Sequence, residues 1–174
     1  AGLKAVGIDG IETNAADVAP AEAEAGRRLA EKTGTRIHSV LRGWMQFNGS
    51  AEQVEASLAK VETALLAAKA YGADAVLVVP CRIGGMPMPK PWEFDIAFDD
   101  ATGHLERVAK GDNSPYADYI KAHDRATDTS REALKRLIPA AEKAGVIKPG
   151  EIYEGVDWSV IFLLAGVIPL GIAL

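Results

Sequence analysis

The sequence predicts an α/β fold in which short parallel strands alternate with helices. Segments with helical patterning end at Gly34, Gly72 and Gly145, and short strand-like runs lie between them. This alternation is typical of βαβ units, which pair their strands in parallel. The chain has 174 residues and is 48% hydrophobic, which suits one domain with a buried core.

The first part of the chain predicts two strands, each preceded by a helix. Residues 1–6 predict the last turn of a helix, and residues 8–12 alternate with the period of a short strand. A helix is predicted over residues 20–33 because Pro20 suits the first helical turn. Residues 36–40 then predict a second strand.

A long helix and a third strand follow. Ser50 and Gln53 have the spacing of a capping box, and the apolar residues after them recur at steps of three and four as far as Gly72. Residues 75–79 form a continuous apolar run. Such a run predicts a strand that is buried on both faces of a parallel sheet.

The next segment interrupts this pattern. Residues 81–117 are rich in glycine and proline and predict a long loop, whose aromatic residues favour an ordered lid. A helix is predicted over residues 117–144, with a kink or break at Pro139. The next strand is expected to begin at residues 146–147.

Composition excludes some classes of function. The net charge is −5 and no basic stripe is present, so nucleic-acid binding is not expected. A single cysteine, Cys81, excludes an intrachain disulfide, and it is not expected to be a nucleophile. No signal peptide pattern is found in the first residues, and the single cysteine fits a reducing compartment, so a cytoplasmic location is expected. Residues 158–174 carry no charge and are marginally long enough to span a bilayer, so membrane association is the alternative.

Several runs together resemble the sugar phosphate isomerase/epimerase family, the xylose-isomerase-like barrels, over about residues 2–147. The runs that carry the resemblance are residues 7–12 (GIDGIE), 37–44 (IHSVLRGW), 70–80 (AYGADAVLVVP), 110–116 (KGDNSPY) and 140–146 (AAEKAGV). The resemblance implies a partial (β/α)₈ TIM barrel over residues 1–152, with about strands two to five and their helices. Residues 153–174 would form a separate apolar helix, and within them residues 156–174 resemble a transmembrane segment of sodium-coupled anion transporters.

The resemblance also implies an activity. It is a proton shift on a sugar or sugar phosphate, assisted by Mn²⁺, Mg²⁺, Zn²⁺ or Co²⁺. Glu151 falls at the position of the family's first metal ligand, although Lys148-Pro149-Gly150 replaces the apolar residues expected before it. The family's other ligands belong to strands that this chain lacks, so we expect weak or absent activity from the chain alone.

Candidate catalytic residues lie near the ends of the first two strands, where barrels carry their chemistry. Glu12 is expected to bind a sugar hydroxyl or act as a base, or else to be a solvated or paired carboxylate. Asn14 is a weaker candidate for substrate binding. His38 is expected to move a proton or polarise a carbonyl, or to be an ordinary core residue. His104 and His123 are expected at the surface.

Candidate substrate-binding residues follow the second and third strands. Arg42 and Arg82 are candidates to hold an anionic group, and Trp44 to stack on a sugar or simply to pack at the rim. Trp92 is expected to close over the rim, or to bury a small core within the long loop.

Two readings without catalysis remain open. The chain is then a scaffold or a fragment attached to a membrane through residues 158–174. Exposed sheet edges also predict self-association into a homo-oligomer.

Overall fold

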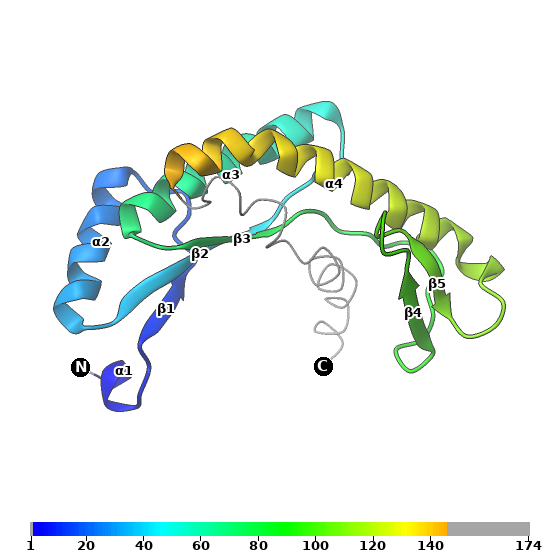
Figure 1. The fold of residues 1–174 in the computed structure, drawn as a ribbon, viewed down its shortest axis with the longest axis horizontal. Helices are drawn as coiled ribbons and strands as arrows, with labels where there is room; N and C mark the ends of the chain where they lie inside the picture. Colours follow the sequence, from blue (N-terminus) through cyan, green and yellow to red (C-terminus); the bar gives the residue numbers. More distant parts are fainter. Residues whose placement is uncertain (1, 146–174) are drawn as a thin grey trace.

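The computed structural model describes residues 2–145 of the chain, and they form an α/β fold with two separate sheets (Figure 1). In chain order the elements are α1 (Gly2–Ala5), β1 (Gly10–Thr13), α2 (Pro20–Thr33), β2 (Arg36–Trp44), α3 (Ala51–Tyr71), β3 (Ala75–Val79), β4 (Phe94–Phe98), β5 (Leu105–Ala109), the 3₁₀ helix η1 (Ser114–Tyr116) and α4 (Ala117–Ala144).

The larger sheet confirms the predicted parallel pairing. Its strand order is β1-β2-β3, and both pairs of neighbours are parallel. Helices α2, α3 and α4 all lie on one side of this bowed sheet, as Figure 1 shows. The sheet has only these three strands among the described residues, so no closed barrel is present in this part of the chain.

Small side chains bring the helices close to the sheet. Val40 of β2 is fully buried against Ala64 and Ala68 of α3 and Ala23 of α2. The two helices also pack tightly on each other, because a Cβ atom at Gly26 would lie 2.9 Å from the ring of Tyr71. Alanine and glycine at these positions therefore set the spacing of the helical layer.

Helix α4 joins a second cluster at the carboxyl end of β2. Leu137 and Ala141 of α4 pack with Leu58 of α3 and with Phe47, which follows β2 and is 1% exposed. The helix is continuous from Ala117 to Ala144, so of the predicted kink or break at Pro139 the break is wrong. Proline is accommodated there on the exposed side of the helix.

The predicted long loop contains an antiparallel hairpin that the sequence reasoning missed. Strands β4 and β5 pair with each other, and their apolar residues pack against the first half of α4. Leu105 and Val108 of β5 meet Tyr119 of α4 in this cluster. The segment is ordered, as predicted, but through a hairpin with its own core.

Two predictions about the strands need correction. Strand β3 is not buried on both faces, because Leu77 is 43% exposed. Its neighbours Val76 and Val78 pack under the helices, so Leu77 points to the uncovered face of the sheet. Strand β2 ends at Trp44 and not at Val40, which places Arg42 and Trp44 in the strand.

Several predictions lie outside the described residues. They concern the strand expected at residues 146–147, the metal ligand Glu151 and the apolar segment of residues 153–174. None of the helices within residues 2–145 combines the length and the hydropathy that a bilayer crossing requires.

The capping box at the start of α3 is expected to contribute measurably to the free energy of unfolding. Ser50 Oγ accepts a hydrogen bond from the Gln53 amide, and Gln53 Oε1 accepts one from the Ser50 amide. Ser50→Ala should lower the free energy of unfolding by about 1 kcal/mol in urea melts. Thr63→Ala is the control in the same helix, because Thr63 is exposed and bonds only to the carbonyl of Ala59. Equal effects of the two changes would contradict a role for the cap.

Candidate functional site

A solvent-open hollow lies where β2 and β3 end. Its volume is about 420 Å³. It is lined by Trp44, Met45, Gln46, Asn48, Gly49, Gln53 and Arg82. The hollow therefore brings together two of the predicted substrate-binding residues, Trp44 and Arg82.

Backbone pairing beyond the strand ends builds this hollow. The Met45 amide donates to the Val79 carbonyl at 2.7 Å, and the Phe47 amide donates to the Pro80 carbonyl at 3.0 Å. The side-chain amide of Asn48 then donates to the Arg82 carbonyl at 3.1 Å. These bonds hold the segments after β2 and β3 beside each other and fix the position of the Arg82 backbone.

The charge of the hollow is positive. Arg82 is exposed, no carboxylate lines the hollow, and no ion pair of Arg82 occurs among residues 2–145. The indole of Trp44 is half exposed beside it. A cation, an aromatic face and several amides suit a polar ligand that carries an anionic group.

Three amide side chains of the hollow were missed by the sequence reasoning. Gln46, Asn48 and Gln53 come from one short segment around the start of α3. Gln53 was recognised only as part of the capping box, and Gln46 and Asn48 were not singled out. The sequence signal that could have found them is the presence of three amide side chains within residues 46–53, between the strand end at Trp44 and the start of α3.

The predicted catalytic residues lie elsewhere on the sheet. Glu12 is the third residue of β1, and its carboxylate accepts a hydrogen bond of 2.9 Å from the hydroxyl of Ser39 on β2. His38 is exposed and follows Ile37, which is buried under the helices, so His38 and Glu12 share the uncovered face.

The two sets of candidates are far apart along the strands. Glu12 pairs in register with Ser39, whereas Trp44 pairs with Val79. Five residues of β2 separate Ser39 from Trp44, which corresponds to roughly 17 Å. One sugar ring is shorter than this, so it cannot touch both sets at once.

Arg42, Asn14 and Trp92 do not line the hollow. Arg42 forms an ion pair with Asp17, and its side chain is 14% exposed. Asn14 is exposed just beyond β1. Trp92 is 78% exposed, with the Lys90 ammonium 5.6 Å from its ring, so the expectation that it buries a core in the loop is wrong.

The described residues provide no set of ligands for a metal ion. Residues 2–145 contain no group of three or more histidine, cysteine, aspartate or glutamate side chains placed to hold an ion. The predicted ligand Glu151 lies outside this range.

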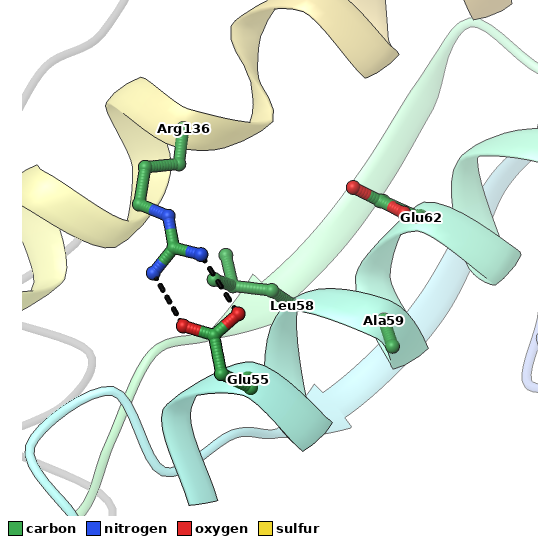
Figure 2. Close-up of a pocket in the computed structure, with 5 residues that line it drawn as sticks. All are labelled: Glu55, Leu58, Ala59, Glu62 and Arg136. Atoms are coloured by element: carbon green, nitrogen blue, oxygen red, sulfur yellow. Dashed lines mark hydrogen bonds and ion pairs between the residues drawn. The ribbon is translucent and has the colours of Figure 1, made fainter. Parts of the chain in front are cut away.

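A second, smaller hollow of about 160 Å³ lies between α3 and α4 on the outside of the helical layer (Figure 2). Its cation, Arg136, already holds both oxygens of Glu55 at 2.8 Å. The hydrogen bonds from Arg136 lower the pKa of Glu55 below its usual value. This ion pair links α3 to α4, and we assign no ligand to the hollow.

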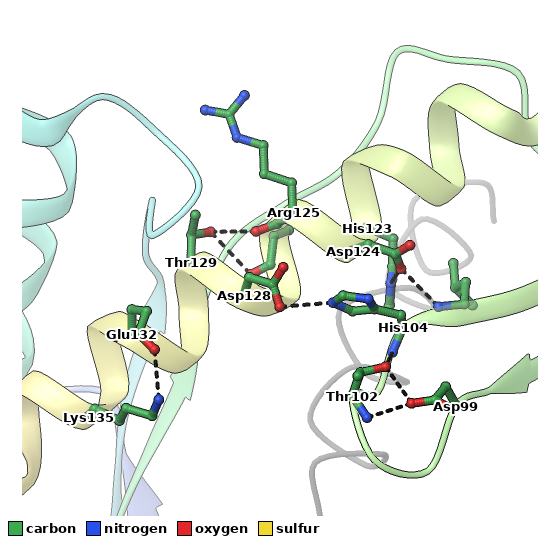
Figure 3. Close-up of polar contacts among 12 residues, drawn as sticks. Asp99, Thr102, His104, His123, Asp124, Arg125, Asp128, Thr129, Glu132 and Lys135 are labelled. Carbon is green, nitrogen blue, oxygen red and sulfur yellow. Dashed lines mark hydrogen bonds and ion pairs between the residues drawn. The ribbon is translucent and has the colours of Figure 1, made fainter.

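Polar contacts fasten the hairpin to α4 (Figure 3). His104 Nε2 lies 2.9 Å from Asp128, and Asp124 accepts a bond of 2.9 Å from the Leu105 amide. His123 is 4% exposed, so the expectation of a surface residue is wrong. Its position beneath the hairpin buries it, although Asp124 lies 3.3 Å from its Nδ1.

Cys81 follows β3 into the interior and is 1% exposed. Its sulfur lies 3.8 Å from the hydroxyl of Ser130, and burial raises the pKa of the thiol. A buried thiol with a raised pKa is a poor nucleophile, which agrees with the expectation that Cys81 does not act as one.

Comparison with known proteins gives one short similarity. No family model matches the chain, and no solved structure matches it. A stretch of 31 residues is 64% identical to the uncharacterized transporter sll0640 of Synechocystis sp.. The stretch covers 18% of this chain and 5% of that transporter, so the similarity does not define a family for the chain.

Burial of His123 predicts a pH dependence of stability. Burial lowers the pKa of His123 below its usual 6.5, and Asp124 opposes this shift only in part. The unfolded chain then binds a proton that the folded chain resists, so stability should fall as the pH drops below 6.5. In urea melts between about pH 7 and pH 5, His123→Gln should show a shallower loss of stability than the unchanged chain. An identical dependence of stability on pH in the two proteins would contradict this assignment to His123.

Proposed function

We propose that this chain is a sugar or sugar phosphate isomerase/epimerase-like domain, with β1, β2 and β3 as part of a (β/α)₈ barrel. The observation that carries the proposal is the hollow at the carboxyl ends of β2 and β3. Parallel βα proteins bind their ligands at that end of the sheet. Within residues 2–145, helices α2, α3 and α4 lie on one face of the parallel sheet, which agrees with a barrel arrangement.

Each lining group has a task in binding. Arg82 supplies charge-assisted hydrogen bonds to a phosphate or carboxylate. Trp44 offers its exposed indole to the apolar face of a sugar ring. Asn48 Nδ2 already donates to the Arg82 carbonyl, and Gln53 Oε1 already accepts from the Ser50 amide. The Asn48 oxygen, the Gln53 nitrogen and the Gln46 amide are therefore the groups that this proposal assigns to the hydroxyl groups of a sugar.

Binding is better supported than turnover. Glu12 and His38 lie roughly 17 to 20 Å from Trp44 of the hollow along the strands. The divalent ion would polarise the sugar carbonyl when bound, but the described residues hold no set of ligands for it. We therefore propose that the chain alone is weakly active or inactive, and that it acts in the cytoplasm.

Completion of the barrel requires further strands beside β1 and β3. These are the outer strands of the parallel sheet, and neither pairs with another described strand on its outer side. A second copy of the chain is one source of such strands, which makes a homo-oligomer part of the proposal.

The alternative function is a scaffold without catalysis, attached to a membrane. Two observations favour it: residues 158–174 carry no charge, and a 31-residue stretch is similar to a transporter. Sedimentation with phosphatidylcholine vesicles distinguishes the two, because a cytoplasmic sugar-binding domain stays in the supernatant.

The binding proposal predicts an effect of Arg82. Arg82→Gln should weaken the binding of fructose 6-phosphate by about tenfold in calorimetric titration, because a charge-assisted pair is lost. The neutral sugar fructose should lose little affinity. Arg28→Gln is the control, because Arg28 is exposed on α2 and makes only a long pair of 3.8 Å with Glu24.

Two outcomes would contradict the proposal. One is equal binding of fructose 6-phosphate by the Arg82 and Arg28 variants. The other is turnover, measured as exchange of the C2 hydrogen of the sugar with D₂O, at a rate typical of enzymes. The second result would reject the inactive state while leaving the binding role of the hollow intact.

A further inference from the structure

Arg82, which carries the positive charge of the hollow beside β2 and β3, is followed by a weakly restrained stretch of backbone. Residues 82–89 form no helix or strand. Apart from their chain neighbours, Gly84 and Gly85 have no atom within 4 Å of the place where a Cβ would lie. Gly85 also has a φ of +84°, which glycine adopts at little cost. The two glycines therefore give the Arg82 backbone little restraint from its carboxyl side.

One side chain restrains the Arg82 backbone directly. Asn48 Nδ2 donates a hydrogen bond of 3.1 Å to the Arg82 carbonyl. Within residues 2–145 this is the only hydrogen bond that any of residues 82–89 makes. On the amino side, Cys81 is 1% exposed and anchors the chain in the interior. Arg82 is thus held between a buried residue before it and the amide of Asn48.

Asn48 is itself held firmly. Phe47 before it is 1% exposed, and the Phe47 amide donates to the Pro80 carbonyl at 3.0 Å. The Gly49 amide donates to the Gln46 carbonyl at 3.0 Å, which closes a turn around Asn48. A hydrogen bond from such a rigid base costs little conformational entropy, so it is an effective restraint on its acceptor.

We propose that Asn48 is a positioning residue, which holds Arg82 where its guanidinium meets the anionic group of the ligand. The inference rests on the proposed function, because the anion is the phosphate or carboxylate of the sugar ligand assigned there. Paired bonds from a guanidinium to an anion require a defined geometry. A displaced Arg82 backbone therefore weakens the binding of a charged sugar more than that of a neutral one.

The positioning role of Asn48 is separable from its direct contact with a ligand. Asn48 lines the hollow, and its oxygen is free to accept a bond from a sugar hydroxyl. That contact is the same for fructose and for fructose 6-phosphate, so it cancels in the ratio of their dissociation constants. This ratio, which we call the phosphate preference, reports the position of Arg82 alone.

Calorimetric titration of variants in the full chain tests the proposal. Asn48→Leu removes the donor at similar size and should lower the phosphate preference about fivefold, the effect of one hydrogen bond. Gln46→Leu is the matched control, because it removes another amide from the same hollow without a bond to Arg82. It should weaken both sugars equally. Adding Asn48→Leu to Arg82→Gln should lower the phosphate preference no further, because the two residues act as one unit.

Limited proteolysis measures the restraint on Arg82 without a ligand. Trypsin cleaves after arginine, so the carbonyl held by Asn48 belongs to the bond that is cut. The next basic residue, Lys90, precedes Pro91 and resists trypsin. Asn48→Leu should speed cleavage after Arg82 about fivefold in the folded chain, because cleavage follows the population of the locally open segment. Gln46→Leu should leave this rate unchanged, and mass spectrometry identifies the fragment that ends at Arg82.

Two results would overturn the proposal. One is a phosphate preference that Asn48→Leu leaves unchanged, in a chain that binds fructose 6-phosphate more tightly than fructose. The other is an equal rate of cleavage after Arg82 in Asn48→Leu and in the unchanged chain. If the unchanged chain binds neither sugar, the proposed function fails, and the cleavage rate alone decides whether Asn48 holds Arg82. Asn48→Ala repeats both measurements if circular dichroism shows that Asn48→Leu is misfolded.

Discussion

Burial of one sheet face under three helices is the constraint on which the described structure depends. Val40 is fully buried at its centre, and alanines on α2 and α3 let the helices approach it closely. With the helices held on one side, β1, β2 and β3 run in the same direction and end toward the same side of the fold. The hollow with Trp44 and Arg82 exists because two of these strands end together.

Helix α4 extends this order beyond the parallel sheet. Its second half packs on α3 through Leu137 and Ala141, and its first half carries the β4–β5 hairpin. Apolar contacts at Tyr119 and polar contacts at Asp124 and Asp128 act on the same helix. One long helix thus fixes the segment after β3, which includes the backbone that positions Arg82.

Sequence reasoning succeeded where the signal is local. The bounds of α2, α3 and α4 follow from proline, a capping box and glycines, all of which act within a few residues. It failed where burial depends on distant parts of the chain. Leu77 is exposed because nothing described covers it, and His123 is buried because the unforeseen hairpin covers it. Trp44 and Arg82 were each predicted to bind substrate after a strand, but the amide side chains that line the hollow with them were found only in the structure.

The stagger of the strands explains why a partial sheet separates binding from chemistry. Strand β1 ends at the level of Val40, whereas β2 and β3 continue to Trp44 and Val79. A barrel distributes such stagger over all its strands, so that side chains from different strands converge at one rim. With three strands the carboxylate of Glu12 stays beside Ser39, about half the length of β2 from Trp44. A catalytic site built from side chains of several strands therefore requires more strands than residues 2–145 provide. Ligand binding, in contrast, needs only the ends of β2 and β3.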